Sequence, residues 1–341
     1  MLNGGSFDII AHMEKQPNIL RVRTFQEMPE EWKEIRRELL ALRNESRTEG
    51  LDLKRIDDFM REKGLPVKEA LIFSDEDLSE ILKICESSGL LPDDAFDECF
   101  AYYILELELV LLKRQPEKEL LNGVIYTESD IIHEKGHASS NYQHYSEFDG
   151  GVYVPRAGFG LPNNDQTGSY SSWGMFFEEG FVEMLSGEYK ARFSTEKEKQ
   201  VQFDMFDLPE GFSTDAIEDM VDFADEELPL PIKYSYLEDE ESFVTSPSSA
   251  AAFGVELLCR KSPELYETMI AARSDLDSLR KIPVLIEKIK PGLYGKLTHL
   301  LTPGEEGGEE DFAKGLKIII DEVYGGKLPL NEKQELDFSL L

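Results

Sequence analysis

The sequence is poor in cysteine, with only Cys85, Cys99 and Cys259 among its 341 residues. Thiols that are so few and so far apart in sequence cannot build a disulfide framework, and their spacing does not suit a metal site made of cysteine ligands. We therefore expect free, buried thiols in a protein of the reducing cytoplasm.

Long hydrophobic runs are also missing. No segment approaches the ~20 uncharged apolar residues that are needed to span a bilayer. The first six residues, MLNGGS, contain no basic segment and lead into no apolar run of the kind that marks a secretory signal. These observations predict a cytoplasmic protein without a membrane partner.

Basic residues are scarce relative to acidic ones. The chain contains 36 Lys and Arg against 69 Asp and Glu, and its formal net charge is −33. Nucleic acids and anionic membranes are polyanions, so a nucleic acid or membrane partner is not expected. Residues 204–241 contain fourteen acidic residues and a single base, Lys233. This acidic section is interpreted as a solvated face, with a rim that attracts basic peptides or cations as the alternative.

Histidine is rare as well, yet two of the five histidines lie in the motif His133-Glu134-Lys135-Gly136-His137. On an α-helix, residues four apart project from the same face, so both imidazoles can bind one zinc ion. Glu134 can then lie beside the open coordination position and take a proton from a bound water. Two solvent-facing histidines on a charged helix are the alternative interpretation.

A catalytic zinc ion requires a third protein ligand. The segment Glu179-Gly180-Phe181-Val182-Glu183 offers one, because Glu179 and Glu183 share a helix face at i and i+4. We expect Glu179 to bind zinc and Glu183 to accept a hydrogen bond from the far nitrogen of a ligating histidine. Glu178 is a rival ligand, although helix phase favours Glu179.

Apolar residues recur at helical spacing along most of the chain. Its 41% hydrophobic content and length are sufficient for two or three packed regions. The helix at 93–113 is the most apolar and is expected to pack behind the motif helix. Residues 139–172 have the composition of loops, with a short strand at 152–154, and a further strand is expected at 124–126. The predicted helices span about 30–42, 56–64, 74–89, 93–113, 127–137, 173–192, 247–258, 275–290, 293–301 and 308–324.

The two motifs together resemble the gluzincin group of zinc metallopeptidases, which includes thermolysin and aminopeptidases with a Glu-Gly-Phe-Ala sequence. The resemblance covers about residues 125–190. It implies His133, His137 and Glu179 as ligands of one zinc ion per chain and Glu134 as the general base. Two features depart from the pattern: 42 positions separate His137 from Glu179, more than in thermolysin, and Glu178 stands where the group often has Asn.

The resemblance also implies a fold. We expect an α+β, predominantly helical chain whose zincin-like core contains the active-site helix, the Glu-bearing helix and a small sheet or hairpin. The expected divisions are a helical region at 1–120, the core at 121–245 and a helical region at 246–341 that packs on the core. The peptidases also use a downstream Tyr or His to stabilise the oxyanion. The candidates for that role are Tyr234, Tyr236, Tyr189 and His299.

The function predicted from the sequence is a zinc-dependent metallopeptidase that acts on a peptide or protein. Two alternatives stay open. One is a catalytically silent protein of zincin fold that binds a partner through its acidic section. The other is a zinc hydrolase of non-peptide amides or esters. Oligomeric state, substrate and cleavage mode are left open by the sequence.

Overall fold

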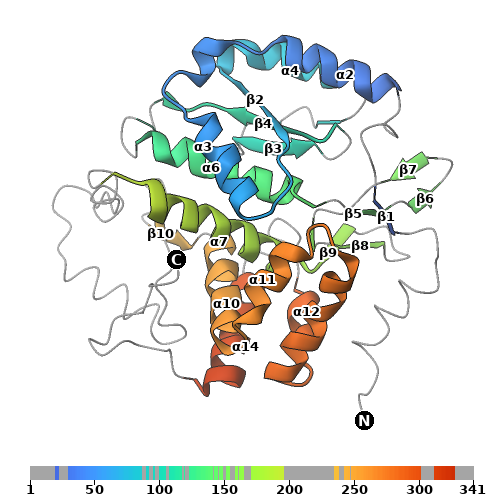
Figure 1. The fold of residues 1–341 in the computed structure, drawn as a ribbon, viewed down its shortest axis with the longest axis vertical. Helices are drawn as coiled ribbons and strands as arrows, with labels where there is room; N and C mark the ends of the chain where they lie inside the picture. The colour runs from blue at the N-terminus through green and yellow to red at the C-terminus, as the bar shows by residue number, and fades with distance from the viewer. Residues whose placement is uncertain are drawn as a thin grey trace.

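The fold is taken from a computed structural model (Figure 1). It describes residues 20–22, 30–86, 90–91, 95–96, 100–104, 107–116, 119, 123–140, 142–144, 146–148, 151–153, 158–159, 161–164, 170–195, 234–237, 242–245, 247–300 and 311–326. Within these residues the chain is predominantly helical, with a small three-stranded sheet.

The sheet has the strand order β2 (Glu69–Phe73), β4 (Leu109–Lys113) and β3 (Ala101–Ile104). The strands β2 and β4 are parallel, with Leu71 opposite Leu111, whereas β3 runs antiparallel to β4. The central strand is buried on both faces, as expected from its near-continuous apolar sequence.

The sheet contradicts the predicted apolar helix at 93–113. Two strands, β3 and β4, lie within that range, and a tight turn at Glu108, with φ of 48°, leads into β4. A dense apolar run fits helical and extended spacing equally well, so its period does not decide between them. The predicted helical region 1–120 therefore contains the sheet.

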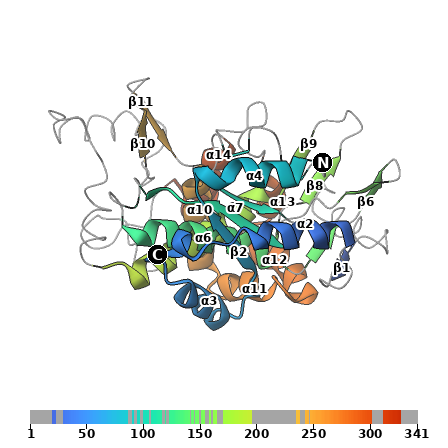
Figure 2. The ribbon, with the colours of Figure 1, turned by 90° about the horizontal axis from the view of Figure 1, so that it is seen from above.

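Helices cover both faces of the sheet. The helices α2 (Glu30–Ala41) and α4 (Asp75–Glu86) lie on one face, where they pack against alternate residues of β2 and β4. Seen from above, both run over the strands (Figure 2). On the other face, Ile72 and Leu112 join the larger core that contains α3 (Leu53–Glu62) and α6 (Val124–Ala138). A 3₁₀ helix at Glu45–Thr48 connects α2 to α3.

The helix α6 contains the His133–His137 motif and begins earlier than predicted. Gly123, with φ of 81°, precedes its first residue, so residues 124–126 form the first helical turn and the predicted short strand there is wrong. Thr127, the predicted first residue of the helix, therefore lies inside it. The Thr127 hydroxyl donates a hydrogen bond to Glu119 at 2.6 Å.

The helix α7 (Met175–Phe193) confirms the helix predicted at 173–192 and packs against α6. Beyond it, α10 (Pro247–Lys261) starts at the first residue of the helix predicted at 247–258. Figure 1 shows α10, α11, α12 and α14 on the side of α7 away from the sheet. These helices are α11 (Glu264–Ala271), α12 (Leu276–Ile289) and α14 (Asp311–Tyr324), and α13 (Leu293–Thr298) also contacts α7.

The remaining strands form four antiparallel pairs. The strand expected at 152–154 corresponds to β7. Most of the acidic section at 204–241 lies outside the described residues, and the domain boundaries near 120 and 245 stay predictions. The pairs are β1 (Leu20–Val22) with β5 (Tyr142–His144), β6 (Ser146–Phe148) with β7 (Gly151–Tyr153), β8 (Leu161–Asn164) with β9 (Tyr170–Trp173), and β10 (Tyr234–Leu237) with β11 (Ser242–Thr245).

In the part of the chain that is described, no helix has both the length and the apolar character to cross a membrane.

Two glycines allow the central helices to approach closely. A Cβ atom on Gly136 of α6 would lie 2.8 Å from Val182 Cγ1 of α7. A Cβ atom on Gly180 of α7 would lie 2.7 Å from the backbone oxygen of Ala251 in α10. The glycine inside the histidine motif is therefore required by helix packing.

The close packing at Gly180 predicts that alanine substitutions at two glycines of α7 change the free energy of unfolding in opposite directions. Gly180→Ala should lower the free energy of unfolding by about 1–3 kcal/mol, because the added methyl group meets backbone that cannot move cheaply. Gly187→Ala is the control, since no heavy atom lies within 4 Å of its added Cβ, and it should raise the free energy of unfolding by about 0.5–1 kcal/mol. Chemical denaturation measures both. Equal effects would contradict the packing described here.

Candidate metal centre

One stripe of α6 is only partly buried by the rest of the protein. From Thr127 to Ala138, the residues that are not buried are Asp130, His133, Glu134 and His137. Their spacing of i, i+3, i+4 and i+7 is that of a single helix face. The intervening residues, including Ile131 and Ile132, are buried in the core. The motif side chains therefore lie on the face of α6 that the rest of the protein buries least.

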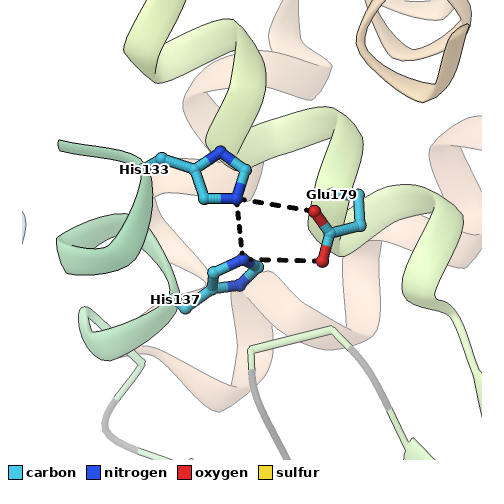
Figure 3. A group of neighbouring side chains, drawn as sticks. All are labelled: His133, His137 and Glu179. Carbon is cyan, nitrogen blue, oxygen red and sulfur yellow. Dashed lines mark hydrogen bonds and ion pairs between the residues drawn. The ribbon is translucent and has the colours of Figure 1, made fainter. Parts of the chain in front are cut away.

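A matching stripe of α7 faces these histidines. Glu179 is half-buried, and the residues that flank it in sequence, Glu178 and Gly180, are buried. The Glu179 carboxylate lies 3.6 Å from His133 Nε2 and 3.5 Å from His137 Nε2. The two Nε2 atoms are 3.2 Å apart. Figure 3 shows the three side chains converging on one point between the helices.

These separations fit a single tetrahedral metal ion. The ligand atoms of His133, His137 and Glu179 all lie within 4.8 Å of one another. Two ligands of one tetrahedral zinc ion, each bound at about 2.0–2.1 Å, lie about 3.3–3.4 Å apart. The donor set of two imidazole nitrogens and one carboxylate oxygen also suits zinc. The residues present therefore fit the metal that the sequence motif suggests.

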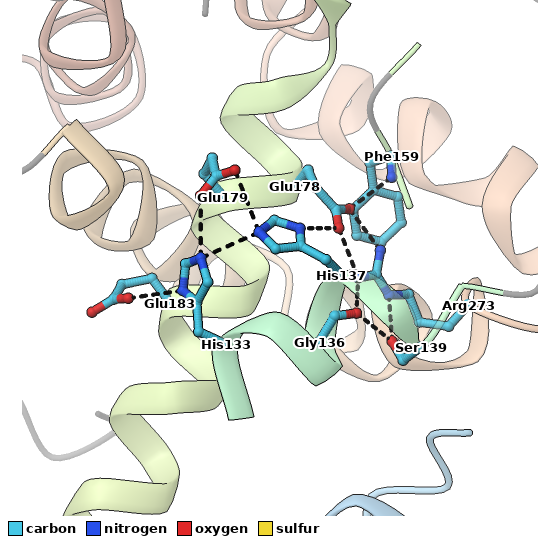
Figure 4. Close-up of polar contacts among 9 residues, drawn as sticks. All are labelled: His133, Gly136, His137, Ser139, Phe159, Glu178, Glu179, Glu183 and Arg273. Carbon is cyan, nitrogen blue, oxygen red and sulfur yellow. Dashed lines mark hydrogen bonds and ion pairs between the residues drawn. The ribbon is translucent and has the colours of Figure 1, made fainter. Parts of the chain in front are cut away.

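The outer nitrogen of each histidine contacts a carboxylate. His133 Nδ1 lies 3.2 Å from Glu183 Oε2, and His137 Nδ1 lies 2.9 Å from Glu178 Oε1 (Figure 4). A carboxylate at Nδ1 favours a proton on that nitrogen and leaves the Nε2 lone pair for a metal. Glu183 is placed as the sequence suggested. Glu178, the rival ligand, contacts the outer side of His137 instead.

Negative charge dominates the electrostatics of the centre. Burial disfavours charging His133, but the hydrogen bond to Glu183 and the charges of Glu179 and Glu134 outweigh burial and raise its pKa to about 10. Burial likewise opposes charging His137, while Glu179 and the hydrogen bond to Glu178 raise its pKa. The side chains thus create a position that favours positive charge, for which a metal ion competes with protons.

Asp130 is a further acidic group on the same stripe, and it was not among the residues expected at the site. Burial raises its pKa to about 7, while the charges of Lys190 and His133 act in the opposite direction. Its position three residues before His133 was the signal that could have identified it. Lys190 also lies 3.9 Å from the Glu183 carboxylate, so it partly balances the acidic groups at this end.

The described part of the structure places none of the candidate oxyanion residues at the centre. Tyr234 and Tyr236 belong to β10, and their side chains lie outside the described residues. His299 is exposed, and its Nδ1 lies 2.5 Å from the Gly295 carbonyl oxygen at the end of α13. Tyr189 is buried and donates a hydrogen bond to Glu128 at 2.7 Å. None of these four is assigned to stabilising an oxyanion.

Arg273 was not predicted from the sequence either, and it binds the Glu178 carboxylate through two nitrogens. Burial alone would raise the pKa of Glu178, but the charge of Arg273 and the hydrogen bonds of His137 and Arg273 lower it to about 2. No local pattern marks a single arginine 95 positions from its partner.

Comparison of the chain with protein-family models, with curated proteins and with solved structures finds no match.

Proposed function

We propose that the protein is a zinc-dependent metallopeptidase. The observation that carries this proposal is the convergence of His133, His137 and Glu179 from two packed helices at distances suited to one metal ion. Glu134 lies on the same stripe of α6 as both histidines. A candidate base on the helix face that carries two of the three candidate ligands supports the proposal.

Three side chains would hold the zinc ion through two Nε2 atoms and the Glu179 carboxylate. A zinc ion with three protein ligands and an open position lowers the pKa of its water to about 7 and polarises a substrate carbonyl. The contacts of Glu183 and Glu178 with the outer nitrogens keep both imidazole rings turned toward the shared point. The ligands are therefore oriented before any metal arrives.

Glu134 is the proposed general base. As the neighbour of His133 on the same stripe of α6, it accepts the proton of the attacking water and passes it to the leaving amine. Protonation of the amine completes cleavage of the peptide bond. A peptide or protein is the substrate class that the paired motifs favour, because their residue types and spacing resemble those of zinc peptidases.

The surroundings of α6 support a zincin-like arrangement. The motif helix packs with one side against β3 and β4 and with another against the Glu-bearing helix α7. The three-stranded sheet thus lies behind the helix that carries the histidines, and the second ligand helix lies beside it. An active-site helix, a Glu-bearing helix and a small sheet are the parts that the sequence motif implied.

Replacing the base should separate metal binding from hydrolysis. Glu134→Gln keeps the size of the side chain and removes its ability to accept a proton. We expect a fall of about 10²–10⁴-fold in the rate of peptide cleavage, with the zinc content of the wild-type protein retained. Cleavage of a peptide library and elemental analysis of the same preparations measure the two quantities.

A second glutamate of α7 provides the control for Glu134→Gln. Glu188→Ala removes a carboxylate of α7 that contacts Lys63 and Tyr266, and it should leave both zinc content and cleavage unchanged. Undiminished cleavage by Glu134→Gln would remove Glu134 from the mechanism. A wild-type protein that binds zinc and cleaves ester substrates but no peptide would instead be a non-peptide hydrolase.

The ligand assignment predicts unequal effects of two neighbouring glutamates. Glu179→Ala removes a direct ligand and should lower zinc affinity by more than about 100-fold, beyond the range expected for residues that only support a ligand. Glu178→Ala should have the smaller effect in the folded protein. Competition with a chelator of known affinity measures both. A larger loss in Glu178→Ala would exchange the roles of the two residues.

A further inference from the structure

A buried ion pair lies on the outer side of His137. The side chains of Glu178 and Arg273 are 0% and 1% exposed. One guanidinium nitrogen lies 2.6 Å from Glu178 Oε2, and a second lies 2.9 Å from Oε1, the oxygen that also contacts His137. Arg273 belongs to the turn between α11 and α12, so a helix pair of the C-terminal third reaches the metal centre.

The same guanidinium binds the end of the motif helix. Its nitrogens also donate to the Gly136 carbonyl oxygen and to Ser139 Oγ, the latter at 3.0 Å. The aromatic rings of Phe159 and Phe181 lie 4.9 Å and 4.6 Å from the guanidinium carbon. All of these contacts are visible around Arg273 and its neighbours in Figure 4, except for Phe181. Arg273 therefore connects α6 and α7 at a fixed point.

A glycine packs directly against the ion pair. Gly158 has a φ of 56°, and a Cβ atom on it would lie 1.8 Å from an Arg273 nitrogen and 1.9 Å from Glu178 Oε2. The next residue, Phe159, donates its backbone N–H to Glu178 Oε2 at 2.8 Å. The Glu178 carboxylate is thus held by His137, Arg273 and the Phe159 amide, with no room for a side chain at position 158.

We propose that Arg273 is a positioning residue that sets the metal affinity of the His133, His137 and Glu179 site by fixing the Glu178 carboxylate against His137 Nδ1. The proposal rests on metal binding at this site and not on hydrolysis. It assigns part of the metal centre to the C-terminal helical region, which contributes no ligand.

The physical reason lies in the charge of Glu178. A buried carboxylate without a counter-charge is costly, so we expect Glu178 to move away from its place beside His137 when Arg273 is removed. That movement weakens the hydrogen bond that orients the His137 ring. A neutral amide at position 178 can accept the same hydrogen bond without any counter-charge. The arginine is therefore needed because residue 178 is a glutamate.

The central experiment measures zinc affinity by chelator competition in the full-length protein, at a temperature where circular dichroism shows each variant to be folded. Arg273→Met should weaken zinc binding by about 10- to 100-fold. The double variant Arg273→Met with Glu178→Gln should regain most of the lost affinity, because an uncharged amide at that position needs no cation. A purely structural role for Arg273 would not be rescued in this way.

A second variant tests the proposal even if Arg273→Met fails to fold. Gly158→Ala removes no polar group, but its methyl group displaces the ion pair and should weaken zinc binding by about tenfold. Gly64→Ala is the matched control, since Gly64 also has a positive φ, of 72°, and no heavy atom lies within 4 Å of its added Cβ. It should keep wild-type zinc affinity.

The outcomes separate this inference from the proposed function. Wild-type zinc affinity in folded Arg273→Met and in Gly158→Ala overturns the role of Arg273 and leaves the peptidase proposal untouched. Equal losses in Gly158→Ala and Gly64→Ala also overturn it, because backbone strain alone would then explain the effect. Zinc binding without peptide cleavage in the wild-type protein overturns the peptidase proposal only. A wild-type protein that binds no zinc overturns both.

Discussion

The close approach of α6 and α7 is the constraint on which the centre depends. Two of the candidate ligands come from one helix and the third from the other, so their Nε2 and carboxylate atoms meet only if the helix axes lie near each other. Gly136 provides that approach, because its missing side chain leaves room for Val182. The glycine at the helix crossing thus permits the close packing that brings the candidate ligands of the two helices together.

The distribution of charge around the centre follows from the same packing. Four carboxylates, those of Glu134, Glu178, Glu179 and Glu183, act on the two histidines and favour positive charge there. Only Glu178 is fully buried, and it alone among the four binds a buried arginine. The other three carboxylates keep partial access to solvent. The structure therefore neutralises the one charge that water cannot reach.

The sequence predicted the parts of this centre that depend on local spacing. His133, Glu134 and His137 share a helix face by periodicity, and Glu179 and Glu183 do so one helix later, so their relative placement followed from helical geometry. The apolar run ending at Lys113 was misread because a strand buried on both faces shows no alternation. Gly158 and Arg273 escaped prediction for a different reason. Their roles arise only from contacts across long sequence separations, which leave no periodic signal.

The position of Arg273 in the chain has a consequence for biosynthesis. The motif helices are translated well before the turn between α11 and α12, and domains of large proteins fold progressively as the chain emerges. If Arg273 fixes Glu178, a nascent chain that has exposed only α6 and α7 holds its ligands loosely. Tight metal binding is then acquired last, when the C-terminal helices dock, and the bound ion becomes a marker of a completely folded molecule.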